Sequence, residues 1–276
     1  MKSKYEYLFC EKENFYNLYI VERKSSIEIA KIYNIKTSTV FYLLKKFDIK
    51  PRNNQEKSKY NLNHSYFEKI DTKEKAYWLG FLFADGYINN QNYVGISLID
   101  SDISHLEKFR DAINSNHIIH TYNCNENCFS RKDGKYCRLI FKSVKMAKDL
   151  ENLGCTNNKS LTLKFPSIEK CFYKDFIRGY FDWDGSFSFS KKNTDFHITG
   201  TKEFLISIIE ILNNTLDINM SEKNLYKRYN DDKNNYTTSI GNKTKTLKFL
   251  NYIYEDSSVY LDRKYFKYLS FLDFIK

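Results

Sequence analysis

The sequence predicts an α+β fold in which a helix–hairpin–helix–strands–helix unit occurs twice, preceded by a small all-helical domain. Three observations support this. Residues 78–86 and 177–185 are both apolar stretches with an internal glycine, and both end in Asp-Gly. Residues 136–145 parallel residues 236–245 at an offset of 100. Residues 13–50 carry separate short amphipathic patterns and a local excess of positive charge.

The charge of the chain indicates an acidic partner. The formal net charge is +10 and the pI is about 9.0. Residues 1–60 hold 13 Lys and Arg against 7 Asp and Glu, a net +6, which leaves +4 for the remainder. Cations combined with 23 Tyr and 22 Phe favour nucleic acid. An AT-rich genome also explains such a composition, but it does not explain where the charge lies.

Other bulk features exclude several protein classes. A hydrophobic content of 42% excludes a disordered chain. The six cysteines lack a disulfide-like spacing, the N-terminus lacks a signal core, and no apolar run approaches membrane length. We expect a soluble, reduced, intracellular protein, in the cytoplasm or nucleoid, or in an organelle or virus-infected cell if it is encoded there.

Residues 1–50 resemble a helix-turn-helix domain. Helices are expected over 13–21, 27–33 and 37–47, with Ser25 able to cap the second and Asn34 able to adopt a left-handed turn. The alternative is an ordinary three-helix bundle with a solvated basic face. A basic linker is expected over 51–71. The candidate DNA-contacting residues here are Lys36, Thr37, Ser38, Thr39, Tyr42, Lys45 and, in the linker, Arg52.

The two repeats are expected over 72–158 and 159–276. Alternation of apolar and polar residues predicts hairpin strands after each Asp-Gly, with one buried and one open sheet face. A terminal amphipathic helix is expected over 263–276. The open sheet faces would carry DNA-contacting residues, for which the candidates are Tyr93, Ser97, Arg138, Ser188, Ser190, Lys192, His197, Lys227 and Arg228.

The Asp-Gly segments predict a paired carboxylate site. Gly80 would let its helix approach the one containing Gly179, which would bring Asp85 beside Asp184. Two adjacent carboxylates at helix C-termini repel each other, and a divalent cation removes that cost. Carboxylate oxygens suit Mg²⁺, which keeps waters and binds substrate phosphate. These residues therefore indicate a Mg²⁺-dependent phosphodiesterase.

The same segments resemble the LAGLIDADG homing endonucleases over roughly residues 72–276. The third, eighth and ninth motif positions are occupied by Gly80 and Gly179, Asp85 and Asp184, and Gly86 and Gly185. The resemblance implies a pseudo-twofold αββαββα duplication that acts as a monomer. It also implies site-specific cleavage of double-stranded DNA at a long asymmetric target, leaving 3′ overhangs. Mg²⁺ is the implied cofactor, with Mn²⁺ able to substitute.

The resemblance also implies roles for individual residues. The catalytic set is Asp85, Asp184, Lys145 and Lys245, and the metal-contacting set is Asp85, Asp184, Ala84 and Trp183. Two departures stand out. Trp183 occupies a position that is usually small, which puts close helix contact in doubt. Phe83 occupies the sixth position, where the second copy has Asp182, a residue expected at the surface or facing DNA.

The sequence suggests three alternatives. The string His117, His120, Cys124, Cys128 suggests zinc, but its spacing is not a strong zinc pattern and the second repeat has no counterpart. An intein is not indicated by Met1 or by the C-terminal residues, so a free-standing or intron-encoded enzyme is expected. A non-cleaving nucleic-acid-binding module of the same fold, either an intron-RNA maturase or a transcriptional regulator, is the competing function.

Overall fold

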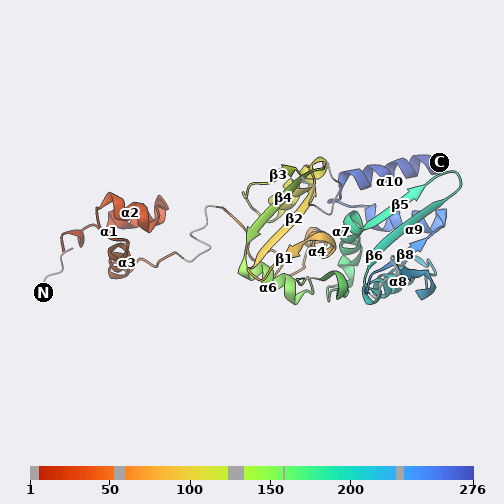
Figure 1. Cartoon of the computed structure of the whole chain (residues 1–276), viewed down its shortest axis with the longest axis horizontal. Coiled ribbons are helices and arrows are strands. Elements are labelled where there is room, and N and C mark those ends of the chain that lie inside the picture. Colours follow the sequence, from red (N-terminus) through yellow and green to blue (C-terminus); the bar gives the residue numbers. More distant parts are fainter. Residues whose placement is uncertain (1–5, 53–59, 124–133, 158, 228–232) are drawn as a thin grey trace. The chain divides into compact units, whose positions relative to one another are not determined.

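The chain forms two compact units, Met1–Tyr60 and Asn61–Lys276. The computed structural model describes residues 6–52, 60–123, 134–157, 159–227 and 233–276 (Figure 1). Each unit has its own buried apolar core. Within the described ranges, no helix is long and apolar enough to cross a membrane.

The N-terminal unit is helical. Its elements are a 3₁₀ turn (Glu6–Leu8), α1 (Lys12–Tyr16), a π-helical turn (Asn17–Val21), α2 (Ser26–Ile32) and α3 (Thr37–Lys46). A capping box begins α2, because Ser25 Oγ accepts the Glu28 N–H at 3.2 Å and the Glu28 carboxylate accepts the Ser25 N–H at 2.7 Å. Asn34 has a φ of 51° and turns the chain into α3. The helices expected over 27–33 and 37–47 are present as α2 and α3. The single helix expected over 13–21 is instead α1 followed by the π-helical turn.

The larger unit contains the duplication. The first repeat consists of α4 (Lys73–Asp85), β1 (Tyr87–Ile88), β2 (Tyr93–Ile99), α5 (Ile103–Ala112), β3 (His120–Asn123), β4 (Lys135–Lys142) and α6 (Val144–Asn152). The second consists of α7 (Tyr173–Asp184), β5 (Gly185–Phe189), β6 (Thr194–Gly200), α8 (Lys202–Leu216), β7 (Leu225–Lys227), β8 (Tyr236–Ile240) and α9 (Lys243–Tyr254). The helix α10 (Asp262–Ile275) follows the second repeat.

The two sheets have the same topology. Their strand orders are β1-β2-β4-β3 and β5-β6-β8-β7, and every pairing is antiparallel. In β2, Val94, Ile96 and Leu98 face the core, as the alternation predicts. In β6, Phe196 and Ile198 do the same. The duplication predicted from the sequence is therefore present, and the fold is the predicted α+β arrangement.

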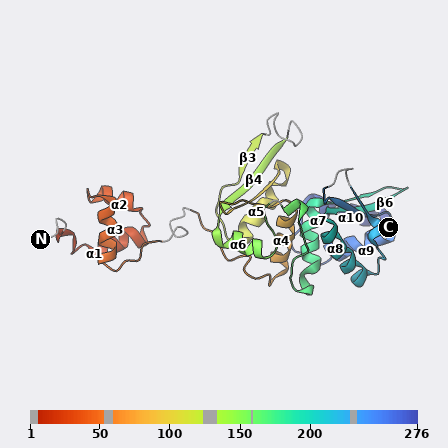
Figure 2. The ribbon, with the colours of Figure 1, turned by 60° about the horizontal axis from the view of Figure 1, so that its bottom comes forward.

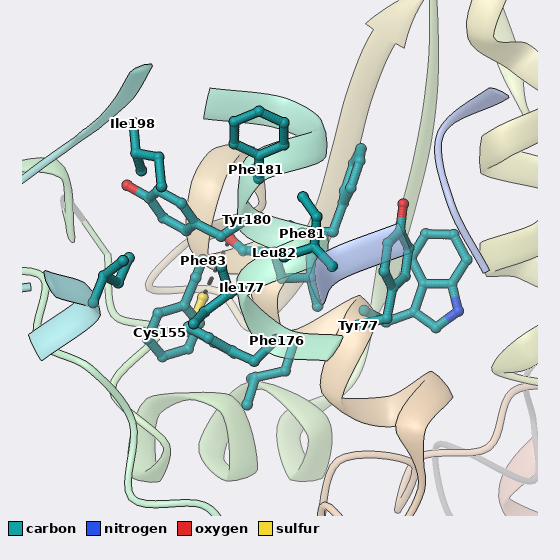
Figure 3. Packing of buried hydrophobic residues seen from close by; sticks show 14 of the residues in the cluster. Tyr77, Phe81, Leu82, Phe83, Cys155, Phe176, Ile177, Tyr180, Phe181 and Ile198 are labelled. Carbon is teal, nitrogen blue, oxygen red and sulfur yellow. Dashed lines mark hydrogen bonds between the residues drawn. The ribbon is translucent and has the colours of Figure 1, made fainter. Parts of the chain in front are cut away.

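Helices α4 and α7 join the two repeats and lie side by side in both views of the molecule (Figures 1 and 2). Their backbones touch. A Cβ on Gly80 would collide with the Phe176 carbonyl and lie 3.0 Å from the Tyr180 nitrogen, and one on Gly179 would collide with the Tyr77 carbonyl. Figure 3 shows part of the apolar core around this contact. Both helices are buried along most of their length, which explains why their sequences are so apolar.

We expect Gly80→Ala and Gly179→Ala to destabilise the larger unit by at least about 1–3 kcal/mol, because the helices must separate to admit a methyl group. Chemical denaturation measures this. Gly241→Ala is the matched control, since its nearest neighbour would be Asn193 Oδ1 at 3.8 Å. Equal stabilities for all three variants would contradict the backbone contact.

Candidate active site

The paired helices bring two carboxylates to one end of the contact. Asp85 is the last residue of α4 and Asp184 the last residue of α7, and each is followed by an extended glycine that ends the helix. Asp184 is half-buried, whereas Asp85 keeps more of its surface exposed. The adjacency inferred from the sequence is thus reproduced by the close approach at Gly80 and Gly179.

Electrostatics confirm that the carboxylates influence each other. Burial raises the pKa of Asp184 to about 7, and the negative charge of Asp85 contributes to this rise. Desolvation raises the pKa of Asp85 to about 6, opposed by the Lys159 ammonium and by a hydrogen bond from the Trp183 side chain. Asp85 is exposed as a whole residue, so solvent weakens the effect of its neighbours.

Two buried lysines, one beside each helix end, accompany the carboxylates. The Lys159 ammonium donates to the Gly86 carbonyl at the end of α4. The Lys264 ammonium donates to the Phe181 carbonyl at 3.2 Å and to the Gly185 carbonyl, at the end of α7. Lys159 is 8% exposed and Lys264 is 7% exposed. Cations at the negative ends of helix dipoles are favourable, and here they also lower the pKa of Asp184.

The donor set suits a hard divalent cation that also binds substrate. In the described part of the chain, no three His, Cys, Asp or Glu side chains gather to hold an ion. Asp85 and Asp184 would therefore supply only part of a coordination shell. Mg²⁺ typically accepts this arrangement, keeping waters and taking phosphate oxygens from its substrate. The residues present fit the cation that the sequence suggested.

Trp183 does not separate the helices. It is half-buried, and its ring meets Phe81 of the first repeat edge-on at 5.8 Å. Close contact is made at the glycines, so a large residue one turn later is tolerated. The doubt about this helix contact, raised by the sequence, is resolved in favour of contact. Ala84, the equivalent residue of α4, is also half-buried.

The expectation for Asp182 was wrong. Rather than facing solvent or DNA, Asp182 is fully buried. Its carboxylate accepts hydrogen bonds from the Tyr254 hydroxyl at 2.6 Å, the Tyr77 hydroxyl at 2.7 Å and the Leu261 N–H at 2.8 Å. A buried charge persists when donors surround it, and periodicity could not reveal those donors because they come from three distant segments.

The two lysines chosen from the sequence lie in different surroundings. Lys145, in the first turn of α6, pairs with Asp149 at 3.1 Å and with Glu68 at 3.4 Å. Lys245 is half-buried in the first turn of α9. Their catalytic role stays a prediction. Lys159 and Lys264 were not among the residues expected in the site from the sequence. Their separation of 105 residues, close to the 99 between Asp85 and Asp184, was the one available signal.

Most candidate DNA-contacting residues of the sheets lie on accessible faces. Ser97 pairs with Arg138, and His197 pairs with Ser186 and Ser239, on the faces opposite the core. Lys227 is exposed at the end of β7, but it does not lie on the open face where it was expected. It pairs with Tyr236, which pairs with Gly200, and this register places it on the same face as the buried Phe196 and Ile198. Its neighbour Tyr226 shares the face of His197 and contacts it at 3.3 Å.

The other sheet candidates are accessible to differing degrees. Tyr93 is half-buried, and Ser188, Ser190 and Lys192 are exposed. The Ser188 hydroxyl donates to Asp195 at 2.6 Å. Arg228 lies outside the described residues.

In the N-terminal unit, the exposed face of α3 carries most of the predicted contacts. Lys36, Ser38, Tyr42 and Lys45 are exposed, and Thr37 is half-buried. Thr39 was expected on the exposed face of α3, but it is only 8% exposed and packs inward.

Arg52, which follows α3, contacts the segment between the π-helical turn and α2. Its guanidinium donates to the carbonyls of Arg23 at 2.9 Å and Lys24 at 2.5 Å and lies over the Tyr19 ring at 4.3 Å. These bonds occupy guanidinium donors that were expected to contact DNA.

The structure does not support a zinc site at the two histidines that it describes. The His117 ring lies 2.7 Å from Ser115 Oγ, and His120 is exposed on β3. Cys124 and Cys128 lie outside the described residues.

We expect Asp184→Asn to stabilise the protein at pH 8 in EDTA by about 2 kcal/mol. The folded pKa of Asp184 is raised above its usual 3.8, so the stability it contributes is present at low pH and lost as pH rises towards 7. The difference from wild type should vanish near pH 4. Urea titrations across this range test it, with exposed Asp273→Asn as the control. A gain that is independent of pH would contradict the desolvated pair.

The larger unit is similar to known proteins. A family model described as a LAGLIDADG-like domain matches residues 172–254. No curated protein matches the chain. Solved structures with a similar fold include the homing endonuclease I-WcaI bound to its DNA recognition sequence, at 15% identity over 73% of this chain and 90% of that one, with a TM-score of 0.48.

Two further structures are similar. Meganuclease I-SmaMI bound to uncleaveable DNA has 13% identity over 73% and 90% of the two chains, with a TM-score of 0.44. Full-length DUF199/WhiA from Thermatoga maritima has 14% identity over 78% and 66%, with a TM-score of 0.47. The motif helix α7, the sheet that follows it and α9 fall within the stretch matched by the family model. Residues 172–254 therefore form a LAGLIDADG-like domain.

Proposed function

We propose that the protein is a site-specific double-strand DNA endonuclease that hydrolyses phosphodiester bonds with Mg²⁺ and leaves 3′ overhangs. The observation that carries this proposal is the pairing of Asp85 and Asp184 at the ends of touching helices, each with a buried lysine beside it. The match of residues 172–254 to LAGLIDADG-like domains supports it. Because one chain supplies both repeats, a monomer suffices.

The residues of the site have separable roles in this proposal. Asp85 and Asp184 would hold the cation, which on binding would neutralise phosphate charge and activate water. Lys159 and Lys264 would stabilise negative charge developing on the two scissile phosphates. Burial lowers the pKa of Lys264 to about 8, so its ammonium is also able to exchange a proton near neutral pH. Open sheet faces carrying Ser97, Arg138 and His197 would contact the grooves.

The N-terminal unit would extend the target. The exposed hydroxyls and lysines of α3 suit the major groove, and the unit has its own core. Two weak binding modules on one chain gain affinity through effective concentration. The competing function, a non-cleaving module of the same fold, predicts binding without cleavage. The presence of both Asp85 and Asp184 favours the endonuclease.

We expect Asp85→Asn and Asp184→Asn to slow double-strand cleavage by more than roughly 10²-fold while leaving DNA affinity nearly unchanged, since only cation coordination is removed. The substrate is a plasmid carrying the DNA of the gene's own insertion locus, incubated with and without Mg²⁺. Linear product and gel-shift affinity are measured in parallel.

Lys159→Met and Lys145→Met accompany the carboxylate variants. Loss of cleavage only in Lys159→Met assigns the lysine role to the buried residue, and loss only in Lys145→Met restores the assignment made from the sequence. Wild-type cleavage by both carboxylate variants would reject the active site. Binding without cleavage by the wild-type protein would favour the competing function.

Removing residues 1–58 should weaken target binding, keep cleavage and shorten the protected footprint on one side only. The slope of log affinity against log salt should become shallower by about 0.9 for each phosphate that the N-terminal unit no longer neutralises. Footprinting and a salt titration of the truncated and full chains measure both effects. An unchanged footprint and slope would remove the DNA-binding role of the N-terminal unit.

A further inference from the structure

The polar network around Asp182 is specific to the second repeat. All three groups bonded to this carboxylate are donors: the hydroxyls of Tyr254 and Tyr77, and the backbone N–H of Leu261. Three donors to one carboxyl group satisfy the hydrogen-bonding capacity of its buried oxygens. Tyr254 belongs to α9 and Tyr77 to α4, so the network ties three parts of the fold to α7.

The bond to Leu261 fixes the start of α10. The Leu261 carbonyl accepts the N–H groups of Lys264 at 2.9 Å and Tyr265 at 3.1 Å, which form the first turn of that helix. From that turn the Lys264 ammonium returns to the carbonyls of Phe181 and Gly185. Asp182 thus holds the base of the lysine whose tip lies beside Asp184.

Arg178, one turn earlier on α7, fixes the preceding connection. Its guanidinium donates to Val259 O at 2.8 Å, Ile253 O at 3.0 Å and Asp175 Oδ1 at 2.8 Å. The segment between α9 and α10 is therefore bonded to α7 through two residues four positions apart. It has little freedom to shift without breaking buried hydrogen bonds.

The first repeat positions its lysine differently. The residue equivalent to Asp182 is Phe83, whose ring meets Phe176 at 5.1 Å and offers no acceptor to a neighbouring segment (Figure 3). Lys159 lies in a short 3₁₀ turn, Lys159–Leu161, in the connection between the repeats. The two lysines occupy similar places beside the helix ends, but their supports differ.

We propose that Asp182 is a positioning residue that places the Lys264 ammonium at one scissile phosphate, so that its loss slows cleavage of one DNA strand and spares the other. This inference rests on the proposed endonuclease function. It treats the two repeats as inequivalent, with the second depending on a carboxylate that the first lacks.

The experiment is strand-resolved, single-turnover cleavage by the full-length protein of its insertion-locus DNA, labelled differently on the two strands. Asp182→Asn should slow one strand by about tenfold or more and leave the other within about twofold. Lys264→Met should slow the same strand, and Lys159→Met the opposite strand. Leu212→Ala, in the core on α8, controls for reduced stability, with each protein assayed equally far below its unfolding midpoint.

Equal slowing of both strands by Asp182→Asn, or slowing of the strand that depends on Lys159, would overturn the proposal. A second readout does not require cleavage. Hydrogen exchange should show weaker protection at the amides of Leu261, Lys264 and Tyr265 in Asp182→Asn, with residues 80–88 unchanged. Unchanged protection at the start of α10 would also overturn the proposal.

Two outcomes need a separate measurement: an Asp182→Asn variant that does not fold, and a wild-type protein that does not cleave. If Asp182→Asn does not fold, Leu261→Pro removes the same hydrogen bond, because proline lacks the N–H and suits the φ of −78° at this position. It should weaken protection in the first turn of α10 and slow the same strand as Lys264→Met. If the wild-type protein cuts neither strand, the proposed function fails, while hydrogen exchange still decides whether Asp182 holds α10.

Discussion

The backbone contact between α4 and α7 is the constraint on which the rest of the larger unit depends. At Gly80 and Gly179 the helices are too close for a Cβ on either side, so each motif needs a glycine there. This contact joins two repeats that each bury one face of a four-stranded sheet. It also sets the position of the last residue of each helix. The same contact between α4 and α7 therefore holds the two repeats together and positions Asp85 and Asp184.

The C-termini of α4 and α7 lie close together, which concentrates negative charge at one place. The ammonium groups of Lys159 and Lys264 lie beside these helix ends. Asp85 and Asp184 lie at the negative dipole ends of their helices. Burial and then the charge of Asp85 raise the pKa of Asp184. Lys159 and Lys264 offset part of this charge from buried positions beside the terminal carbonyls. In the proposed function, a divalent cation shared between the two carboxylates would offset more of this charge and would bind a substrate phosphate.

The N-terminal unit is held together by its own set of contacts. Its core is formed by its own short helices, with Phe15 against Tyr33 and Phe47, and the turn at Asn34 depends on a left-handed residue. Arg52 binds the chain after α3 back onto this unit. These contacts all lie within the unit, which has its own hydrophobic core. This supports a role as an additional binding module.

The sequence by itself determined the duplication, the alternation of the strands, the capping of α2 and the two motif carboxylates, because each depends on local periodicity or on a repeated pattern. It did not determine where Asp182, Thr39 and Lys227 face, nor that Lys159 and Lys264 accompany the carboxylates. The face of Lys227 depends on strand register, and the burial of Thr39 depends on packing within the N-terminal unit. The surroundings of Asp182, Lys159 and Lys264 depend on contacts between segments separated by roughly 70 to 105 residues. Only the tertiary structure decides them, because a buried polar side chain is defined by partners that lie far away in the chain.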